Sequence, residues 1–238
     1  MSDVGVVRAS RNRRLPRAVR ERQMMDAAVR VFGQRGYRAA SMDEIAELAG
    51  VSKPLVYLYL HSKEELFTAC VRREGEALID AVRAGAEPGL PADRQLWAGL
   101  TAFFAHTADH PDGWAVLHRQ ARTHGEPFAG EVTLLRDRLV AYVAELVGAA
   151  ARESRATVAP AVPAGASGAV PPPPSDLGGR DVTGLAQALV GAAESLAGWA
   201  NDTPSVSSRE AAATLMNFAW TGLGGLMAGE RWSAGADA

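Results

Sequence analysis

The stretch "AGVSKPLVYLYLHSKEEL", residues 49–66, carries more apolar and aromatic surface than one short helix can bury. Pro54 suits the first turn of a helix, because the N–H group that proline lacks would have no intrahelical partner there. Gly50 favours the end of the segment before it, which leaves a turn of three residues, Gly50-Val51-Ser52. Two short helices joined by such a turn are typical of a helix-turn-helix motif.

The helix that starts near Lys53 has two faces. Val56 and Leu60 are four residues apart and are expected to point inward. The opposite face then presents Lys53, Leu55, Tyr57, Leu58 and Tyr59. In a DNA major groove, leucine can contact thymine methyl groups, and lysine or tyrosine can bond phosphates or base edges. An ordinary core position in a helical bundle is the alternative that the periodicity leaves open.

The neighbouring segments also have helical periods and helix-end signals. A helix is expected over residues 17–35, closed by Gly36 in a left-handed conformation. Two capping boxes follow, Ser41 with Glu44 and Ser62 with Glu65. The first opens a helix of about nine residues, and its expected inward side chains are Ile45, Leu48 and Ala49. The second opens a longer helix that runs toward residue 85.

The remainder of the chain indicates an all-α fold. Further helical stretches are expected at about 92–110, 112–124, 128–153, 181–201 and 207–229, and no segment is convincing as a strand. Residues 156–179 contain six prolines and one charge, which predicts a disordered, flexible loop. A docking segment for a protein partner is the alternative interpretation of that loop.

Charge is distributed unevenly along the chain. Residues 1–63 carry a formal charge of +6, and the rest carries −8. The segment 1–16 is rich in arginine and lacks periodicity, so it is interpreted as a flexible basic arm, either solvated or bound to a polyanion.

No apolar run reaches the roughly 18 residues of a membrane helix, and no secretory signal is recognisable, so we expect a cytoplasmic protein. The single cysteine, Cys70, excludes an intramolecular disulfide framework.

Residues 24–67 resemble the N-terminal DNA-binding domain of the TetR family of bacterial transcriptional regulators. The matching positions are Ala28, Phe32, Gly36-Tyr37, Ser41, Ile45-Ala46, Ala49-Gly50-Val51-Ser52, Tyr57 and Ser62-Lys63-Glu64-Glu65-Leu66. The resemblance implies a helix-turn-helix domain over residues 17–63, with three helices. It also implies a larger helical domain over 64–232 for ligand binding and dimerisation.

The resemblance implies roles for particular residues. Phosphate contacts would fall to Ser41, Tyr57 and Lys63, and the residues nearest the base edges would be Ser52, Lys53, Leu55 and Tyr59. The chain departs from the common pattern at Pro54-Leu55, where the family often has Gly-Thr, and at Tyr59, where it often has histidine. Base-specific hydrogen bonds are therefore expected to be sparse, with apolar contacts and DNA shape deciding more of the choice.

The C-terminal segments suit a dimer and a ligand cavity. Small residues recur in the last two helices, among them Gly191, Ala192, Ala193, Gly198, Ala212, Ala219, Gly222, Gly225 and Gly229. In the family these helices form the homodimer interface, which predicts a palindromic operator. A core within one subunit is the alternative. The candidate ligand contacts, in a family whose middle helices enclose an effector, are Trp97, Phe104, Trp114, His118, Arg122 and Asn217.

Catalytic and metal functions are not predicted. His106 and His110 are spaced as metal ligands can be, but Pro111 disfavours a helical His110 and no third ligand is suitably spaced. No nucleophile elbow, phosphate loop or dinucleotide turn occurs, so no enzyme and no cofactor are expected.

The prediction is a repressor that leaves DNA when a small apolar or aromatic molecule binds. The alternatives are control by a protein partner and transcriptional activation.

Overall fold

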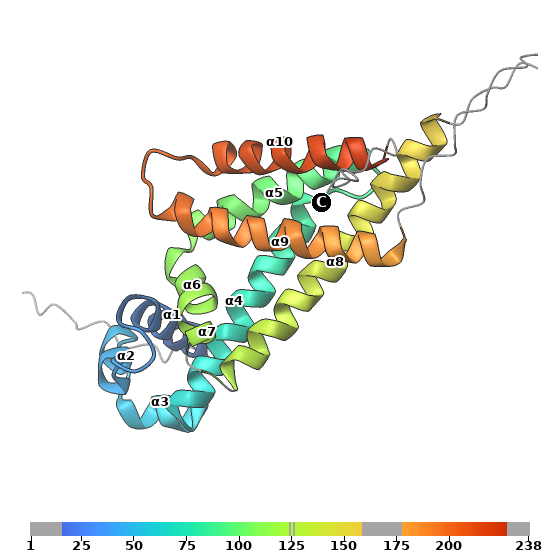
Figure 1. The fold of residues 1–238 in the computed structure, drawn as a ribbon. Coiled ribbons are helices and arrows are strands. Elements are labelled where there is room, and N and C mark those ends of the chain that lie inside the picture. Colours follow the sequence, from blue (N-terminus) through green and yellow to red (C-terminus); the bar gives the residue numbers. More distant parts are fainter. Residues whose placement is uncertain (1–15, 124, 126, 159–177, 228–238) are drawn as a thin grey trace, which may run out of the picture.

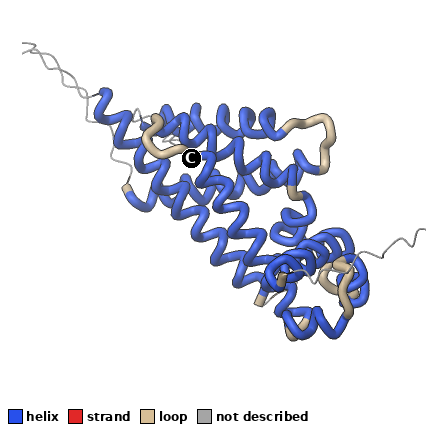
Figure 2. The backbone as a smooth tube through the Cα atoms, turned by 180° about the vertical axis from the view of Figure 1, so that it is seen from behind, coloured by secondary structure: helices blue, strands red, loops and turns tan. Residues whose placement is uncertain are grey.

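The computed structural model describes residues 16–123, 125, 127–158 and 178–227. Within these ranges every regular element is helical and none is a strand (Figure 2), which confirms the all-α prediction. The helices are α1 Arg17–Arg35, α2 Met42–Leu48, α3 Lys53–Leu60, α4 Lys63–Gly85, α5 Ala92–Asp109, α6 Pro111–Ala115, the π-helical turn η1 Val116–Gln120, α7 Ala121–Thr123, α8 Phe128–Val158, α9 Gly179–Asn201 and α10 Ser208–Met227.

The helices form a small head and a larger body. Figure 1 shows α1, α2 and α3 gathered at one end, with α4 leading from this head into the body beside α8. In the body, α5 packs against α4 and α10, and α9 packs against α8. The head also touches the body directly, because α1 packs against α6 and η1. The passage of the chain into α4 and the contacts of α1 with α6 and η1 therefore hold the head against the body.

An aromatic cluster fixes the junction between head and body. Phe32 of α1 lies edge-on to Phe67 of α4, with ring centroids 4.9 Å apart. Phe67 in turn lies edge-on to Phe128 at the start of α8, at 4.7 Å. Tyr37 packs against Phe67 and Phe128, each at 4.9 Å. Edge-to-face pairs contribute about 0.5–1.5 kcal/mol beyond their buried area, so this cluster stabilises the junction.

The expected helix ends are largely present. Gly36 closes α1 with a φ of 82°, and the Ser62 hydroxyl accepts a hydrogen bond of 3.0 Å from the Glu65 N–H. Ser41 also caps α2, but its hydroxyl accepts from the Asp43 N–H at 3.1 Å. The reciprocal half of both capping boxes is wrong, because neither the Glu44 nor the Glu65 carboxylate bonds the N–H of its cap residue in the described part of the chain. The Glu44 carboxylate pairs with Arg35 at 3.2 Å instead.

Leu48 was expected to point inward and does not, since 48% of it is exposed. The helix α2 has only seven residues, and Met42, Ile45 and Ala46 already occupy the face that is buried. Leu48 is the last residue of α2, next to the turn, and is not part of that buried face. The inward prediction for Val56 is confirmed, as its side chain has no exposed area.

Two other boundaries differ from expectation. The segment 112–124 is interrupted, with α6 and α7 separated by the π-helical turn η1. The helix α8 continues to Val158 and α9 begins at Gly179, so both ends of the expected loop 156–179 are helical. Some predictions lie outside the described residues, namely those for the arm up to residue 15, the loop over 159–177, Gly229 and the Leu60 side chain. No helix among the described residues is long and apolar enough to cross a membrane.

Candidate functional site

The outer surface of the head is built around the turn between α2 and α3. Gly50 adopts a φ of 64° there, which glycine tolerates without steric cost, and nothing lies within 4 Å of where its Cβ would be. The Val51 N–H bonds the Ala46 carbonyl at 3.0 Å, so the turn is closed. Val56 anchors α3 to the head core, while Leu58 on the other face is 70% exposed.

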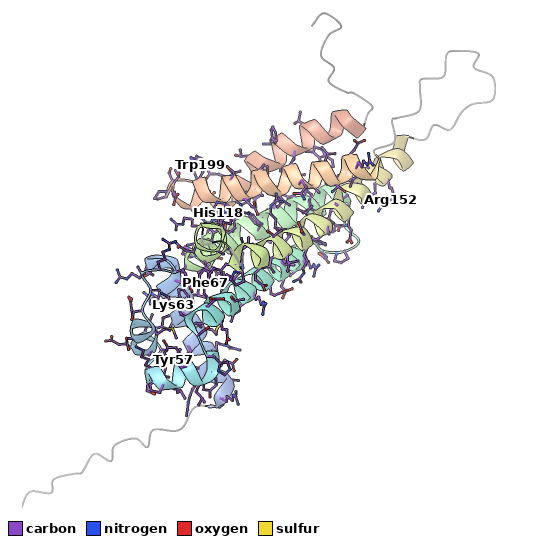
Figure 3. The ribbon with its side chains drawn as sticks, turned by 60° about the horizontal axis from the view of Figure 1, so that its bottom comes forward. Tyr57, Lys63, Phe67, His118, Arg152 and Trp199 are labelled. Carbon is purple, nitrogen blue, oxygen red and sulfur yellow. The ribbon has the colours of Figure 1, made fainter. Side chains whose placement is uncertain are left out.

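The residues with predicted DNA contacts divide into two groups. Ser41, Ser52, Lys53 and Tyr57 are exposed, and Figure 3 places Tyr57 on α3 at the end of the molecule opposite to Trp199. Leu55, Tyr59 and Lys63 are half-buried. The Arg17 guanidinium lies 5.0 Å from the centroid of the Tyr59 ring, so this tyrosine is packed against the start of α1. Arg17 therefore lies beside this surface, next to the helix-turn-helix, where a basic residue can reach DNA.

Lys53 joins the two helices of the motif. Its Nζ lies 2.9 Å from Asp43 Oδ2 at the start of α2, and both side chains are largely exposed. The hydrogen bond to Asp43 and the charge of Asp43 raise the pKa of Lys53, so the ammonium group is retained. A phosphate that approached this surface would compete with Asp43 for the Lys53 ammonium.

Lys63 sits at the first turn of α4. Its Nζ donates a hydrogen bond of 3.1 Å to the Arg38 carbonyl and lies 5.0 Å from the centroid of the Tyr37 ring. Burial lowers the pKa of Lys63. Because free N–H groups and the helix dipole favour anions at a helix N-terminus, the start of α4 is a suitable position for a phosphate contact.

Three of the predicted ligand residues, Trp114, His118 and Arg122, line one cavity in the body. The cavity has a volume of about 40 Å³ and lies between α4, η1, α8 and α9. Its apolar wall consists of Leu78, Ile79, Leu117, Val132, Leu135 and Leu139. Two further polar side chains line it that the sequence reasoning missed, Arg136 and Glu194.

His118 lines this cavity with a ring nitrogen that lacks a hydrogen-bond partner among the described residues. Its ring stacks on Trp114 with centroids 4.8 Å apart and an interplanar angle of 10°. Its Nδ1 atom is buried and has no hydrogen-bond partner among the described residues. Burial is the main cause that lowers the pKa of His118, and the nearby charge of Arg122 adds to it. The ring also lies beside Gly198 of α9, where an added Cβ would be in ordinary van der Waals contact with His118 Nε2, at 3.8 Å.

The other three predicted ligand residues lie elsewhere. Trp97 of α5 is half-buried, with the Arg209 guanidinium 5.6 Å from its ring centroid. Phe104 is 2% exposed and lines a separate cavity of about 170 Å³ near the connection from α9 to α10. Asn217 is exposed on α10. The structure therefore brings together only half of the predicted ligand set.

His106 and His110 face a groove of about 890 Å³ between α1, α4 and the end of α5. Their ring centroids are 4.5 Å apart. In the described part of the chain, no three histidine, cysteine or acidic side chains are arranged to hold a metal ion.

Comparison with known proteins relates both parts of the chain to one family. Residues 24–70 match the family described as "Bacterial regulatory proteins, tetR family", and residues 92–166 match "Tetracyclin repressor-like, C-terminal domain". The chain is 34% identical over 137 residues to the HTH-type transcriptional activator FasR of Mycolicibacterium smegmatis. The aligned segment covers 58% of this chain and 63% of that protein. It is 43% identical over 77 residues to the regulator BetI of Rhizobium meliloti, which covers 32% and 38%. The matches thus span less than two thirds of these curated relatives.

Two solved structures extend the comparison to the fold. A TetR-like transcriptional regulator from Rhodococcus sp. RHA1 is 38% identical, with a TM-score of 0.71 over 89% of this chain and 100% of that one. The regulator FadR of Bacillus subtilis, in complex with stearoyl-CoA, has a TM-score of 0.62 at 16% identity, over 89% and 100%. The second likeness concerns the fold alone.

Proposed function

Because the chain belongs to the TetR family of helix-turn-helix transcriptional regulators, we propose that it is a ligand-responsive repressor. It binds a palindromic operator and leaves it when a small apolar or aromatic molecule enters the body. The observation that carries this proposal is the cavity lined by Trp114, His118 and Arg122, which has an apolar wall, a few polar groups and direct contact with α4. A cytoplasmic location follows from the need to reach DNA.

The head supplies the DNA contacts in this proposal. Tyr57 and Leu58 project from α3, and both are exposed. Lys63 at the start of α4 and Ser41 at the start of α2 flank them and hold phosphates. Contacts from two helix starts position the head, and α3 then meets the base edges.

Dimerisation is the second part of the proposal. Two large apolar side chains are exposed on the last two helices, Trp199 of α9 at 53% and Phe218 of α10 at 76%. A two-fold interface on these helices would cover both side chains and present two heads to one DNA duplex.

Transcriptional activation is the candidate for the opposite sign of regulation, since the relative FasR is named as an activator. Control by a protein partner is the alternative to a small-molecule effector. Thermal unfolding with a small-molecule library separates these, because a ligand that binds the folded state raises its melting temperature.

The decisive experiment is a footprint on the DNA upstream of the protein's own gene. The wild type should protect a palindromic site, and the double variant Tyr57→Ala/Lys63→Ala should not. Arg138→Ala is the matched control, because it removes an exposed cation from α8, away from the head. Equal protection by the wild type and the double variant would show that the assigned DNA contacts are wrong.

A further inference from the structure

An ion cluster with an excess of positive charge lines the cavity of Trp114, His118 and Arg122. The Arg122 Nη2 lies 2.8 Å from Glu194 Oε1, and the Arg136 Nε lies 3.4 Å from Glu194 Oε2. Arg136 also donates to Gln187 of α9. Two guanidinium groups thus share one carboxylate, and Glu194 is the only acid among the described residues that line this cavity.

The Glu194 carboxylate is nearly enclosed, with 14% of its side chain exposed, against 27% for Arg136 and 37% for Arg122. A partly buried arginine without an anion is costly, so the two guanidinium groups need a carboxylate or phosphate partner. In the structure Glu194 fills that position. One net positive charge remains after the pairing.

The space next to this cluster is apolar. A second cavity of about 40 Å³ adjoins the first, because Leu139 lines both. It is lined only by apolar residues, from Val82 of α4 through Leu100 and Phe103 of α5 to Leu189 of α9. Each cavity is small, so an apolar chain would enter by parting side chains along α8.

We infer that Glu194 occupies the position of the effector's head group, and that the effector is an apolar molecule ending in a carboxylate or phosphate. The anionic head displaces Glu194 from Arg122 and Arg136, and the apolar part extends past Leu139. This inference rests on the proposed function, since it names the chemistry of the ligand for the same cavity. The unpartnered Nδ1 of His118, one helical turn before Arg122, supplies a further hydrogen bond to the head.

The exchange has a structural consequence. The pair between Arg122 and Glu194 joins the segment after η1 to α9, and η1 itself packs against α1 and α4. When a free ligand takes the place of Glu194, the ion pair that joins α7 to α9 is lost. The ligand is not part of the chain, so it does not hold Arg122 to α9 as Glu194 does. A π-helical turn at this point fits a functional segment, since such turns are frequent at functional sites.

The test uses the full chain and three probes that share one alkyl chain, namely octanoate, octyl phosphate and octan-1-ol. Isothermal titration calorimetry measures the affinity for each probe. A charge-assisted contact should make the wild type bind at least one anion about tenfold more tightly than the alcohol. Arg122→Gln and Arg136→Gln should each remove this preference. Arg138→Gln should keep it, because Arg138 forms its ion pair with Glu76, outside the cavity. Tighter binding of octyl phosphate than of octanoate would support the anion site and assign phosphate as its head group.

Glu194→Gln provides a second, independent variant. A neutral amide holds the two arginines less strongly, so the affinity for the anion should rise. Weaker anion binding by Glu194→Gln, equal binding of anion and alcohol by the wild type, or unchanged preference in both arginine variants would overturn the inference. Circular dichroism of each variant checks that it is folded.

A gel shift with operator DNA separates this inference from the proposed function. If the anion binds with the expected arginine dependence but leaves DNA affinity unchanged, the site is correct and ligand-controlled repression is wrong. If no alkyl anion is preferred but another ligand releases the DNA, repression stands and the anion site is wrong.

Discussion

Neighbouring side chains of α3 have opposite roles that follow from where each points. Val56 is fully buried in the head, and Leu58, two residues later, is 70% exposed. A helix turns by about 100° per residue, so positions two apart face in very different directions. Because Val56 is buried, we expect it to stabilise the fold. Because Leu58 is exposed, it is available to contact DNA.

Val56→Ala and Leu58→Ala should therefore separate stability from DNA binding. Removing two buried methyl groups at Val56 should lower the free energy of unfolding by about 2 kcal/mol. Leu58→Ala should change it by less than about 0.5 kcal/mol and weaken operator binding. Urea denaturation and gel shifts measure the two effects. A Leu58 variant that binds the operator like the wild type would remove this residue from the DNA surface.

His118 should make stability depend on pH. Burial lowers the pKa of its imidazole below the unfolded value of 6.5, so the unfolded chain takes up the proton first as the pH falls. The stability is then fully present above pH 6.5 and decreases as the pH drops below it. Urea denaturation at about pH 7.5 and about pH 5.5 should show this loss, and His118→Gln should show a smaller one. Equal losses in both proteins would contradict the assignment.

At the scale of elements, α1 of the head approaches α6 of the body closely at Gly33. A Cβ at Gly33 would lie 2.7 Å from the Asp112 carbonyl oxygen and 2.8 Å from its Cα. These are backbone atoms, which cannot rotate away as a side chain does. The Gln34 amide also donates to the Asp112 carboxylate at 3.3 Å. The absence of a side chain at residue 33 therefore sets how closely the head lies against α6.

Gly33→Ala should lower the free energy of unfolding by about 1–3 kcal/mol, because the added methyl group has no room. The matched control is Gly184→Ala in α9, where nothing lies within 4 Å of the added Cβ. That variant should be more stable by up to about 1 kcal/mol, since alanine favours helix over glycine. Thermal and urea unfolding measure both. If Gly33→Ala is stabilised as much as the control, the α1–α6 contact is looser than the structure indicates.

At the scale of the whole molecule, large apolar side chains are exposed both on the head and on the last two helices of the body. Tyr57 and Leu58 are exposed on the head, where we propose the DNA contacts, and Trp199 and Phe218 are exposed on the helices α9 and α10. Large exposed apolar side chains in a neighbouring pair of helices favour an interface between proteins. The two-fold dimer proposed above would use this surface.

Trp199→Ser/Phe218→Ser should shift the protein from dimer to monomer in sedimentation velocity. The fold should persist, because both side chains are mainly exposed in the single chain. Leu134→Ser is the matched control, as Leu134 is 63% exposed but lies on α8. A double variant that remains as dimeric as the control would place the interface on another surface.

The sequence by itself determined most of the helices and the helix-turn-helix motif, because caps and periodicity act within about four residues. It did not predict the π-helical turn η1. Gly50 and Pro54 set helix ends through their backbone conformation, and Ser62 does so through its side-chain hydroxyl. The tertiary structure decided which distant groups meet. Arg136 and Glu194 are 58 residues apart, and Arg17 reaches Tyr59. Such contacts depend on how helices cross, which local periodicity does not specify. For the same reason only three of the six predicted ligand residues share one cavity.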